Sequence, residues 1–76
     1  MYENNPKLFL DKIVENVKIE RQKRGISQLK LALILDFNSP NYVAKIETRK
    51  HGVTYNLIHL CKIAEAFDIE VIDLFP

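Results

Sequence analysis

Hydrophobic residues recur at the three- and four-residue spacing of an α-helix along almost the whole chain, and this period limits what the chain can fold into. The helix-breaking residues are few. Two glycines and three prolines occur among 76 residues, each where one helix should end or the next begin. No segment shows the two-residue alternation of a β-strand. The pattern therefore predicts an all-α domain.

Capping signals divide the chain into five predicted helices. Asn5 followed by Pro6 is typical of an N-cap with proline at the first helical position. Gly25 is a typical C-terminal stop for the helix that begins at Pro6. Ser27 is a cap for a second helix, and Ser39 followed by a proline repeats the first signal. The predicted helices cover about residues 6–24, 27–35 and 40–48, then a fourth that starts at Thr54 or Asn56 and runs to about residue 67, and a fifth over about residues 70–75.

The predicted core comes from one apolar stripe on each of the two long helices. On the first helix the stripe consists of Phe9, Leu10, Ile13, Val14 and Val17. On the fourth helix it consists of Leu57, Leu60, Cys61, Ala64 and Phe67. We expect Cys61 to be a small buried residue, because free cysteine is among the most buried residue types.

The length is that of one small domain, which we expect to span residues 1–76 with residues 1–8 as an N-terminal arm. The longest apolar run, residues 31–35, is far shorter than the ~20 residues that span a bilayer, and no signal peptide is evident. Cys61 has no partner cysteine, and its spacing from the two histidines suits no metal site. We expect a cytoplasmic protein without membrane contact, metal or cofactor.

The overall charge of +1 hides a basic middle between acidic ends. Residues 18–50 hold eight basic and three acidic residues, a net charge of +5, whereas both flanking segments are negative. A basic face of this kind is typical of a protein that binds a polyanion. The alternative is a solvated charge pattern that has no partner.

A very short turn around residues 36–38 separates the second and third predicted helices. This is the spacing of a helix-turn-helix, whose second helix enters the major groove of DNA. Neighbouring helices of any all-α bundle can be joined as tightly, so the spacing alone leaves both interpretations open.

A series of short blocks carries a family resemblance. The blocks are Arg21, Arg24-Gly25-Ile26-Ser27-Gln28, Leu31-Ala32, Leu35, Tyr42-Val43-Ala44-Lys45-Ile46-Glu47, Leu60 to Phe67, and Val71 to Phe75. In order and spacing, residues 17–75 resemble the Cro/cI-type helix-turn-helix family, also called XRE or lambda-repressor-like. The resemblance implies a compact five-helix domain with a helix-turn-helix at about residues 27–48. Such a domain binds double-stranded DNA, commonly as a homodimer, and regulates transcription.

The sequence departs from the family pattern in three places. The turn before Val43 is one residue longer than usual, and the loop over residues 48–56 is about two residues longer. The second helix carries Leu29, Leu33 and Ile34 where the family mostly places polar residues. These departures affect the start of the third helix and the environment of the second.

The resemblance implies that the third helix reads DNA. By helical angle, Val43 and Ile46 share the core side of this helix, and the opposite side is polar. The predicted base contacts are Asn41, Ala44, Lys45 and Thr48. Asparagine pairs with adenine, lysine reaches guanine, and the alanine or threonine methyl group touches a thymine methyl group. The alternative is an ordinary solvated helix face.

The predicted contacts to the DNA backbone surround that helix and carry basic or hydrogen-bonding side chains. They are Gln28, Lys30, Ser39, Tyr42, Arg49, Lys50 and His51. Gln28 can also brace the third helix or be a solvated first-turn residue, and Tyr42 can instead cover the rim of the core. Each basic contact is weak by itself, but together they match the positive charge of residues 18–50.

By helical angle, Arg21 lies on the same side of the first helix as its apolar stripe. The aliphatic stem of Arg21 should therefore lie against the core, and its charge needs a partner. Glu47 is the natural partner because it lies beside Val43 and Ile46 on the third helix. The resemblance also implies an arginine–glutamate pair at these positions. We predict a structural ion pair that fixes the third helix on the first.

The second helix carries more apolar residues than its core side needs. We expect the N-terminal segment, through Tyr2 and Leu8, to cover Leu29 and Leu33, because a partner bound there would obstruct the DNA-reading helix. A homodimer contact is expected instead on the last two helices. Its predicted residues are Ile58, Val71, Ile72 or Phe75.

Two functions from different classes remain open. The first is a sequence-specific DNA-binding transcriptional regulator. The alternative is a protein-interaction module, such as an antitoxin or a regulatory partner protein, which the apolar surplus of the second helix favours. The sequence shows no nucleophile–base pair and no glycine-rich phosphate loop, so we expect neither an enzyme nor a small-molecule substrate.

Overall fold

The computed structural model describes residues 4–76. Within that range the chain forms four α-helices and one short 3-10 helix. They are α1 (Pro6–Lys23), α2 (Gln28–Ile34), α3 (Asn41–Thr48), α4 (Leu57–Phe67) and η2 (Val71–Leu74). The all-α prediction is confirmed, but the predicted fifth helix is wrong, because η2 is a single 3-10 turn. It ends there because the backbone is extended at Phe75, and the Pro76 that follows disfavours the helical conformation in the preceding residue.

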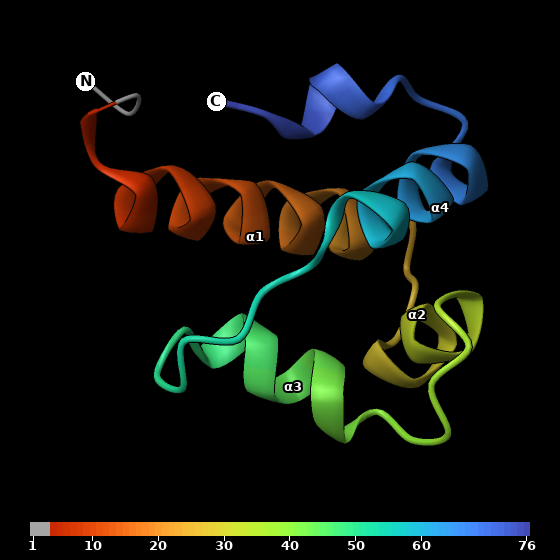
Figure 1. The fold of residues 1–76 in the computed structure, drawn as a ribbon. Helices are drawn as coiled ribbons and strands as arrows, with labels where there is room; N and C mark the ends of the chain where they lie inside the picture. Colours follow the sequence, from red (N-terminus) through yellow and green to blue (C-terminus); the bar gives the residue numbers. More distant parts are fainter. Residues whose placement is uncertain (1–3) are drawn as a thin grey trace.

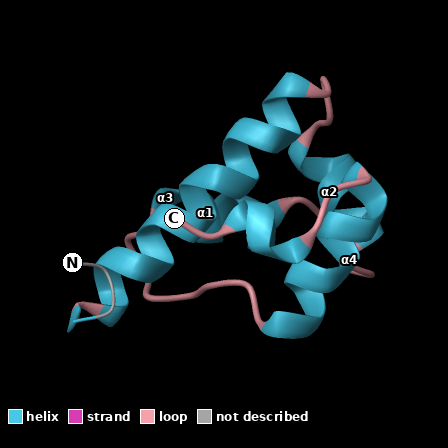
Figure 2. Ribbon diagram, turned by 90° about the horizontal axis from the view of Figure 1, so that it is seen from above, coloured by secondary structure: helices cyan, strands magenta, loops and turns pink. Residues whose placement is uncertain are grey.

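Helix α1 is the longest and forms the axis of the domain (Figure 1). Helices α2 and α3 lie on one side of α1, η2 lies on the other, and α4 lies in front of its C-terminal half (Figure 1). Helix α1 contacts α3, α4 and η2, whereas α2 packs on α3 and α4. Figure 2 shows the same helices from above, joined only by loops over residues 4–76.

The core lies where these helices converge, and each of them contributes to it. Its buried apolar residues are Ile13, Val14, Val17, Leu31, Ala32, Leu35, Val43, Ile46, Tyr55, Leu60, Ile63, Ala64, Phe67 and Leu74. On α1 the apolar stripe is fully buried only in the middle of the helix, and Phe9 and Leu10 pack against the core while partly exposed. The predicted side of α1 therefore does face inward.

Helix α4 is rotated relative to the prediction. Its buried residues follow the spacing i, i+3, i+4, i+7 from Leu60 through Ile63 and Ala64 to Phe67. Cys61 is exposed, so the prediction that it is a buried residue is wrong. The larger and fully buried Ile63 takes the inward position, since burying its greater apolar surface stabilises the fold more.

Two of the predicted helix starts are confirmed by their capping hydrogen bonds. The Asn5 side chain accepts from the backbone N–H of Leu8 at 3.1 Å, and the Ser27 hydroxyl accepts from that of Lys30 at 3.0 Å. Residues 6–8 consequently belong to α1, so the predicted arm over residues 1–8 is too long. Helix α3 begins one residue later than predicted, with Pro40 as its N-cap.

The apolar residues of α2 that do not face the core remain on the surface. Leu29 and Leu33 are about half exposed, and so is Leu8. The prediction that Leu8 covers them is wrong, because the cap at Asn5 fixes Leu8 in the first turn of α1, at the end of the domain away from α2 (Figure 1). Tyr2, the other residue of the predicted cover, lies outside the described residues.

Candidate DNA-binding surface

The connection between α2 and α3 is a compact turn over residues 35–40. The backbone N–H of Phe37 returns to the carbonyl oxygen of Ala32 at 2.8 Å and closes the C-terminal end of α2. Asp36 makes this possible by adopting the left-handed conformation, with φ at 65°. The turn sets α3 directly beside α2, so α2, the turn and α3 form a helix-turn-helix.

Helix α3 separates its side chains between the core and the solvent. Val43 and Ile46 are completely buried against the rest of the domain. On its outer side, the predicted base-contact residues Asn41, Lys45 and Thr48 are exposed, and Ala44 between them is half-buried. The Thr48 hydroxyl donates to the carbonyl oxygen of Lys45 at 2.8 Å, which leaves its methyl group as the free part of the side chain.

A buried polar cluster holds α3 in place. The Arg21 guanidinium donates through Nε and Nη2 to the two carboxylate oxygens of Glu47, at 2.9 and 3.1 Å. Its third nitrogen, Nη1, donates to the carbonyl oxygen of Ile26 at 2.7 Å. Gln28 Nε2 donates to the same Glu47 carboxylate at 2.9 Å. One carboxylate of α3 is thereby tied to both α1 and the start of α2.

Gln28 thus has a structural contact as well as its predicted contact with DNA. It is half-buried in the first turn of α2, and one of its amide hydrogens is already directed at Glu47. A primary amide has two donor hydrogens, so the second is available to another acceptor. The side chain can therefore position α3 and still face a ligand from the same place.

The residue that ends α3, Arg49, is also held within the domain. It adopts the left-handed conformation at the helix C-cap, with φ at 56°. Its Nε donates to Asp11 of α1 at 2.7 Å, and its Nη1 donates to the carbonyl oxygen of Val53. The Arg49 hydrogen bond is the main cause that lowers the pKa of Asp11, which keeps the carboxylate charged. Sequence spacing gave no signal for this contact between α1 and the loop after α3.

The remaining predicted backbone contacts surround α3 with positive charge and hydrogen-bonding groups. Lys50 and His51 are exposed in the loop that follows α3, and Lys30 is exposed in the first turn of α2. Ser39 is half-buried, and its hydroxyl accepts from the backbone N–H of Asn41 at 3.3 Å. Apart from Lys30, these residues form one continuous stretch of chain with α3.

Tyr42 stands at the edge of the α3 face as the first ring of an aromatic series. Its ring meets Phe37 edge to face at 4.9 Å between centroids, Phe37 meets His59 at 5.3 Å, and His59 meets Tyr55 at 6.3 Å. The tyrosine therefore covers the rim of the core while its exposed edge remains beside the outer face of α3. None of Phe37, His59 and Tyr55 was predicted to lie beside this face, and the one signal in the sequence is that Phe37 is an aromatic residue inside the turn.

His59 also caps α4. Its Nδ1 accepts from the backbone N–H of Asn56 at 3.2 Å, and the backbone N–H of His59 donates to Asn56 Oδ1 at 2.7 Å. Partial burial lowers the pKa of His59, and the nearby Lys62 charge lowers it further. The neutral imidazole is the form that fits here, since only neutral Nδ1 can accept a hydrogen bond.

Within residues 4–76, no helix combines the length and apolar character required to cross a bilayer. Over the same residues, no three histidine, cysteine or acidic side chains are grouped closely enough to hold a metal ion.

Comparison with known families agrees with this arrangement. The helix-turn-helix family model matches residues 17–74, which include all of α2, α3 and α4. The class defined by the fold and the surface is therefore a helix-turn-helix domain. The chain belongs to the Cro/cI-type, or XRE, helix-turn-helix family, whose members bind DNA. Searches of curated proteins and of solved structures find no match.

Proposed function

We propose that this protein is a sequence-specific transcriptional regulator that inserts the outer face of α3 into the major groove of duplex DNA. The observation that carries the proposal is the combination of an exposed polar face on α3 with a buried cluster behind it. Three hydrogen bonds to Glu47 fix the helix before it meets DNA, so little ordering remains to be done on binding.

In this proposal the base contacts come from Asn41, Ala44, Lys45 and Thr48. The Asn41 amide is suited to adenine and the Lys45 ammonium to guanine, while Ala44 and the Thr48 methyl group are suited to thymine. Within the described residues neither Asn41 nor Lys45 uses its side chain for an internal hydrogen bond, so both are available.

The DNA backbone contacts are proposed to lie on either side of α3. Lys30 lies in the first turn of α2, Ser39 and Tyr42 lie at the start of α3, and Lys50 and His51 follow its end, so each is placed to reach a phosphate beside the groove. Gln28 contributes its second amide hydrogen. Arg49 contributes less than its charge suggests, because Asp11 already neutralises it. We propose that two copies bind two half-sites in the cytoplasm, as a homodimer.

The alternative function is a protein-interaction module. Exposed Leu29 and Leu33 on α2 favour it, because uncovered apolar residues on one helix face are typical of a protein contact site. The two functions differ in their dependence on salt. A protein contact through leucine side chains is insensitive to salt, whereas phosphate contacts release counterions and weaken steeply.

A binding titration against a random-sequence duplex pool tests the proposal. If about four phosphates are neutralised per domain, log K should fall with log salt at a slope of roughly −4. Lys45→Ala should reduce discrimination among selected sequences, and Lys50→Ala, the matched control, should weaken all duplexes alike. A slope near zero would rule out phosphate contacts and favour the protein-interaction module.

A further inference from the structure

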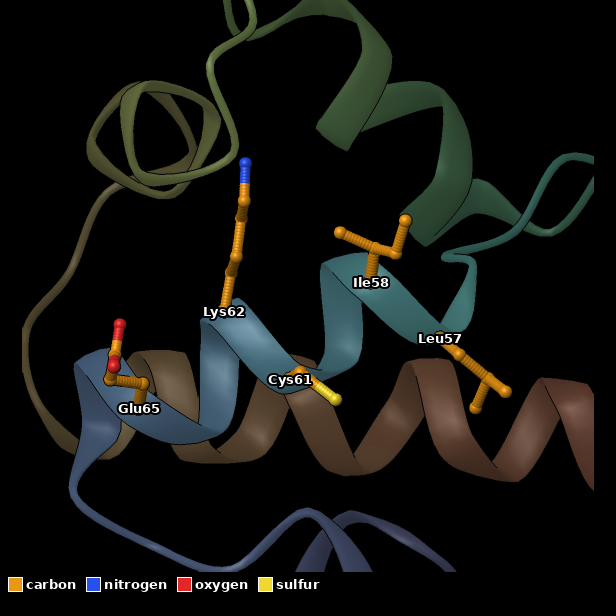
Figure 3. Close-up of a pocket in the computed structure, with 5 residues that line it drawn as sticks. All are labelled: Leu57, Ile58, Cys61, Lys62 and Glu65. Atoms are coloured by element: carbon orange, nitrogen blue, oxygen red, sulfur yellow. The ribbon is translucent and has the colours of Figure 1, made fainter.

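Helix α4 supports the turn between α2 and α3 with two side chains that lie one helical turn apart. The His59 ring meets Phe37 edge to face at 5.3 Å between centroids, and Lys62 Nζ contacts the Asp36 carboxylate at 2.8 Å. Figure 3 shows Lys62 extending from α4 toward this turn. Asp36 and Phe37 are also the residues whose backbone closes α2. The turn is therefore held by α4 as well as by its own hydrogen bonds.

Phe37 connects this support to the proposed DNA-binding face. Its ring contacts both His59 on α4 and Tyr42 on α3, and it meets the Tyr42 ring edge to face at 4.9 Å between centroids. Tyr42 belongs to the first turn of α3, next to Asn41, and is 38% exposed. In the proposed function Tyr42 contacts the DNA backbone, and such contacts fix the register of a reading helix on the duplex.

We propose that His59 is a positioning residue for α3. Its neutral ring keeps Phe37, and through Phe37 the Tyr42 ring, in place beside the base-reading side chains. Protonation in mildly acidic solution displaces the His59 ring and lowers the discrimination between DNA sequences. The inference rests on the proposed function, because it describes a regulation of the same DNA-binding surface.

The imidazole keeps its position by accepting a hydrogen bond. Its Nδ1 accepts from the backbone N–H of Asn56 at 3.2 Å, which completes the capping box at the start of α4. A protonated ring carries N–H on both nitrogens and has no acceptor, so two N–H groups would then face each other. The ring has to turn away from Asn56, and its contact with Phe37 changes with it.

The charges around His59 act in the same direction. His59 lies in the first turn of α4, where the positive end of the helix dipole disfavours a cation. Partial burial lowers the pKa of His59, and the Lys62 charge on the same helix lowers it further. On the neighbouring segments, Asp36 of the turn is already paired with Lys62, and burial keeps the Tyr55 hydroxyl neutral. A protonated ring is therefore better accommodated in solvent than in its place against Phe37.

Sequence discrimination is the quantity to measure, because affinity alone combines two effects. Protonation adds positive charge to the protein, and added charge strengthens binding to the phosphates of every duplex alike. His51, exposed in the loop after α3, contributes to the same general effect. The ratio of the affinities for a selected duplex and for a duplex of the same composition in scrambled order removes this contribution.

Binding titrations at constant salt test the inference at about pH 8 and about pH 5, the range over which histidine titrates. In the wild type the affinity ratio should fall several-fold at the lower pH. His59→Phe keeps an aromatic ring against Phe37 and has no proton to gain, so its ratio should stay near the higher wild-type value at both pH values. His51→Asn, the matched control, should keep the wild-type pH dependence of the ratio.

Two outcomes of these titrations would contradict the inference. A wild-type ratio that is high and equal at both pH values would show that protonation of His59 does not reach the DNA-binding face. A ratio that falls in His59→Phe as it does in the wild type would assign the pH dependence to another group. A wild type that discriminates at neither pH would instead overturn the proposed function, and the inference with it.

Phe37→Leu tests the route from α4 to α3. Leucine keeps an apolar side chain at this half-buried position but removes the ring that contacts both His59 and Tyr42. The affinity ratio should be lower than in the wild type at about pH 8 and should change little on acidification. The full wild-type pH dependence in this variant would show that His59 acts without Phe37 and would overturn the inference.

Nuclear magnetic resonance of the full chain without DNA follows the rings directly. The ring proton resonances of Phe37 and Tyr42 should shift with the same midpoint as the His59 imidazole, and this midpoint should be absent from His59→Phe. Methyl resonances of the buried Val17 should stay in place, as expected while the core remains folded. Ring resonances that ignore the titration of His59 would overturn the inference and leave DNA binding intact.

Discussion

Arg21 of α1 and Glu47 of α3 face each other side-on, joined by two hydrogen bonds of 2.9 and 3.1 Å, with side chains only 9% and 5% exposed. Both charges are therefore removed from water. The two parallel hydrogen bonds between the side chains and one further hydrogen bond made by each side chain stabilise the pair there. Ile26 and Gln28 supply those contacts. The pair connects the longest helix of the domain to the helix that we propose reads DNA.

Removing one member of this pair should be costly. Arg21→Ala leaves a buried carboxylate without its main donor, and we expect the free energy of unfolding to fall by about 3–5 kcal/mol. In a double-mutant cycle with Glu47→Ala, urea unfolding should give a coupling well above the ~0.2–1 kcal/mol of exposed pairs. Coupling within error of zero would mean that the two side chains do not depend on each other.

Asp11 should restrain the DNA affinity of the domain. It neutralises Arg49 at the C-terminal end of α3, so Asp11→Asn should release a positive charge beside the proposed DNA surface. We expect tighter binding to duplex DNA and a salt slope steeper by roughly 0.9, the value of one additional phosphate contact. Glu15→Gln is the control, because it removes the same charge from a residue that pairs with Lys12 instead. Equal slope changes in both variants would show that net charge alone is responsible.

Stability should decrease in mildly acidic solution because of His59. Its pKa in the folded protein lies below the ordinary value of 6.5, so the unfolded chain takes up the proton more readily. The contribution of His59 is therefore fully present above pH 6.5 and is lost as the pH falls from there toward the folded pKa. The thermal midpoint should decline over this window in the wild type and less in His59→Asn.

The exposed His51 provides the control for that measurement. His51→Asn should keep the wild-type pH dependence, because His51 lies exposed in the loop after α3, away from the α4 cap. The carboxylates whose pKa is lowered, Asp11, Glu20 and Asp36, lose their contributions only at lower pH, since their ordinary values are 3.8 and 4.5. A decline that persists unchanged in His59→Asn would assign the effect to another group.

Tyr55→Phe should stabilise the domain. Tyr55 is only 3% exposed, and its hydroxyl has no hydrogen-bond partner within the described part of the chain. Burial and the nearby Glu47 charge raise the pKa of this hydroxyl, so it stays neutral. Removing an unpaired buried hydroxyl should raise the free energy of unfolding by about 1 kcal/mol. A loss of similar size in urea unfolding would indicate that the hydroxyl has a partner after all.

The sequence by itself determined the features that depend on residues within a few positions of one another. The caps at Asn5 and Ser27 start α1 and α2 as predicted, because a capping side chain bonds the backbone three residues ahead. The helical period likewise identified Val43 and Ile46 as the buried side of α3. The blocks over residues 17–75 identified the family.

Only the tertiary structure decided how the helices rotate against one another. The hydrophobic period predicts the buried side of a helix to within about one residue. On α4 it predicted that Cys61 is buried, but in the packed structure Ile63 is buried and Cys61 is exposed. The contact between Asp11 and Arg49 joins residues 38 positions apart, and it exists because the left-handed end of α3 turns Arg49 back toward α1. Local sequence does not encode such contacts, because they form only when separate helices are brought to a particular distance and angle.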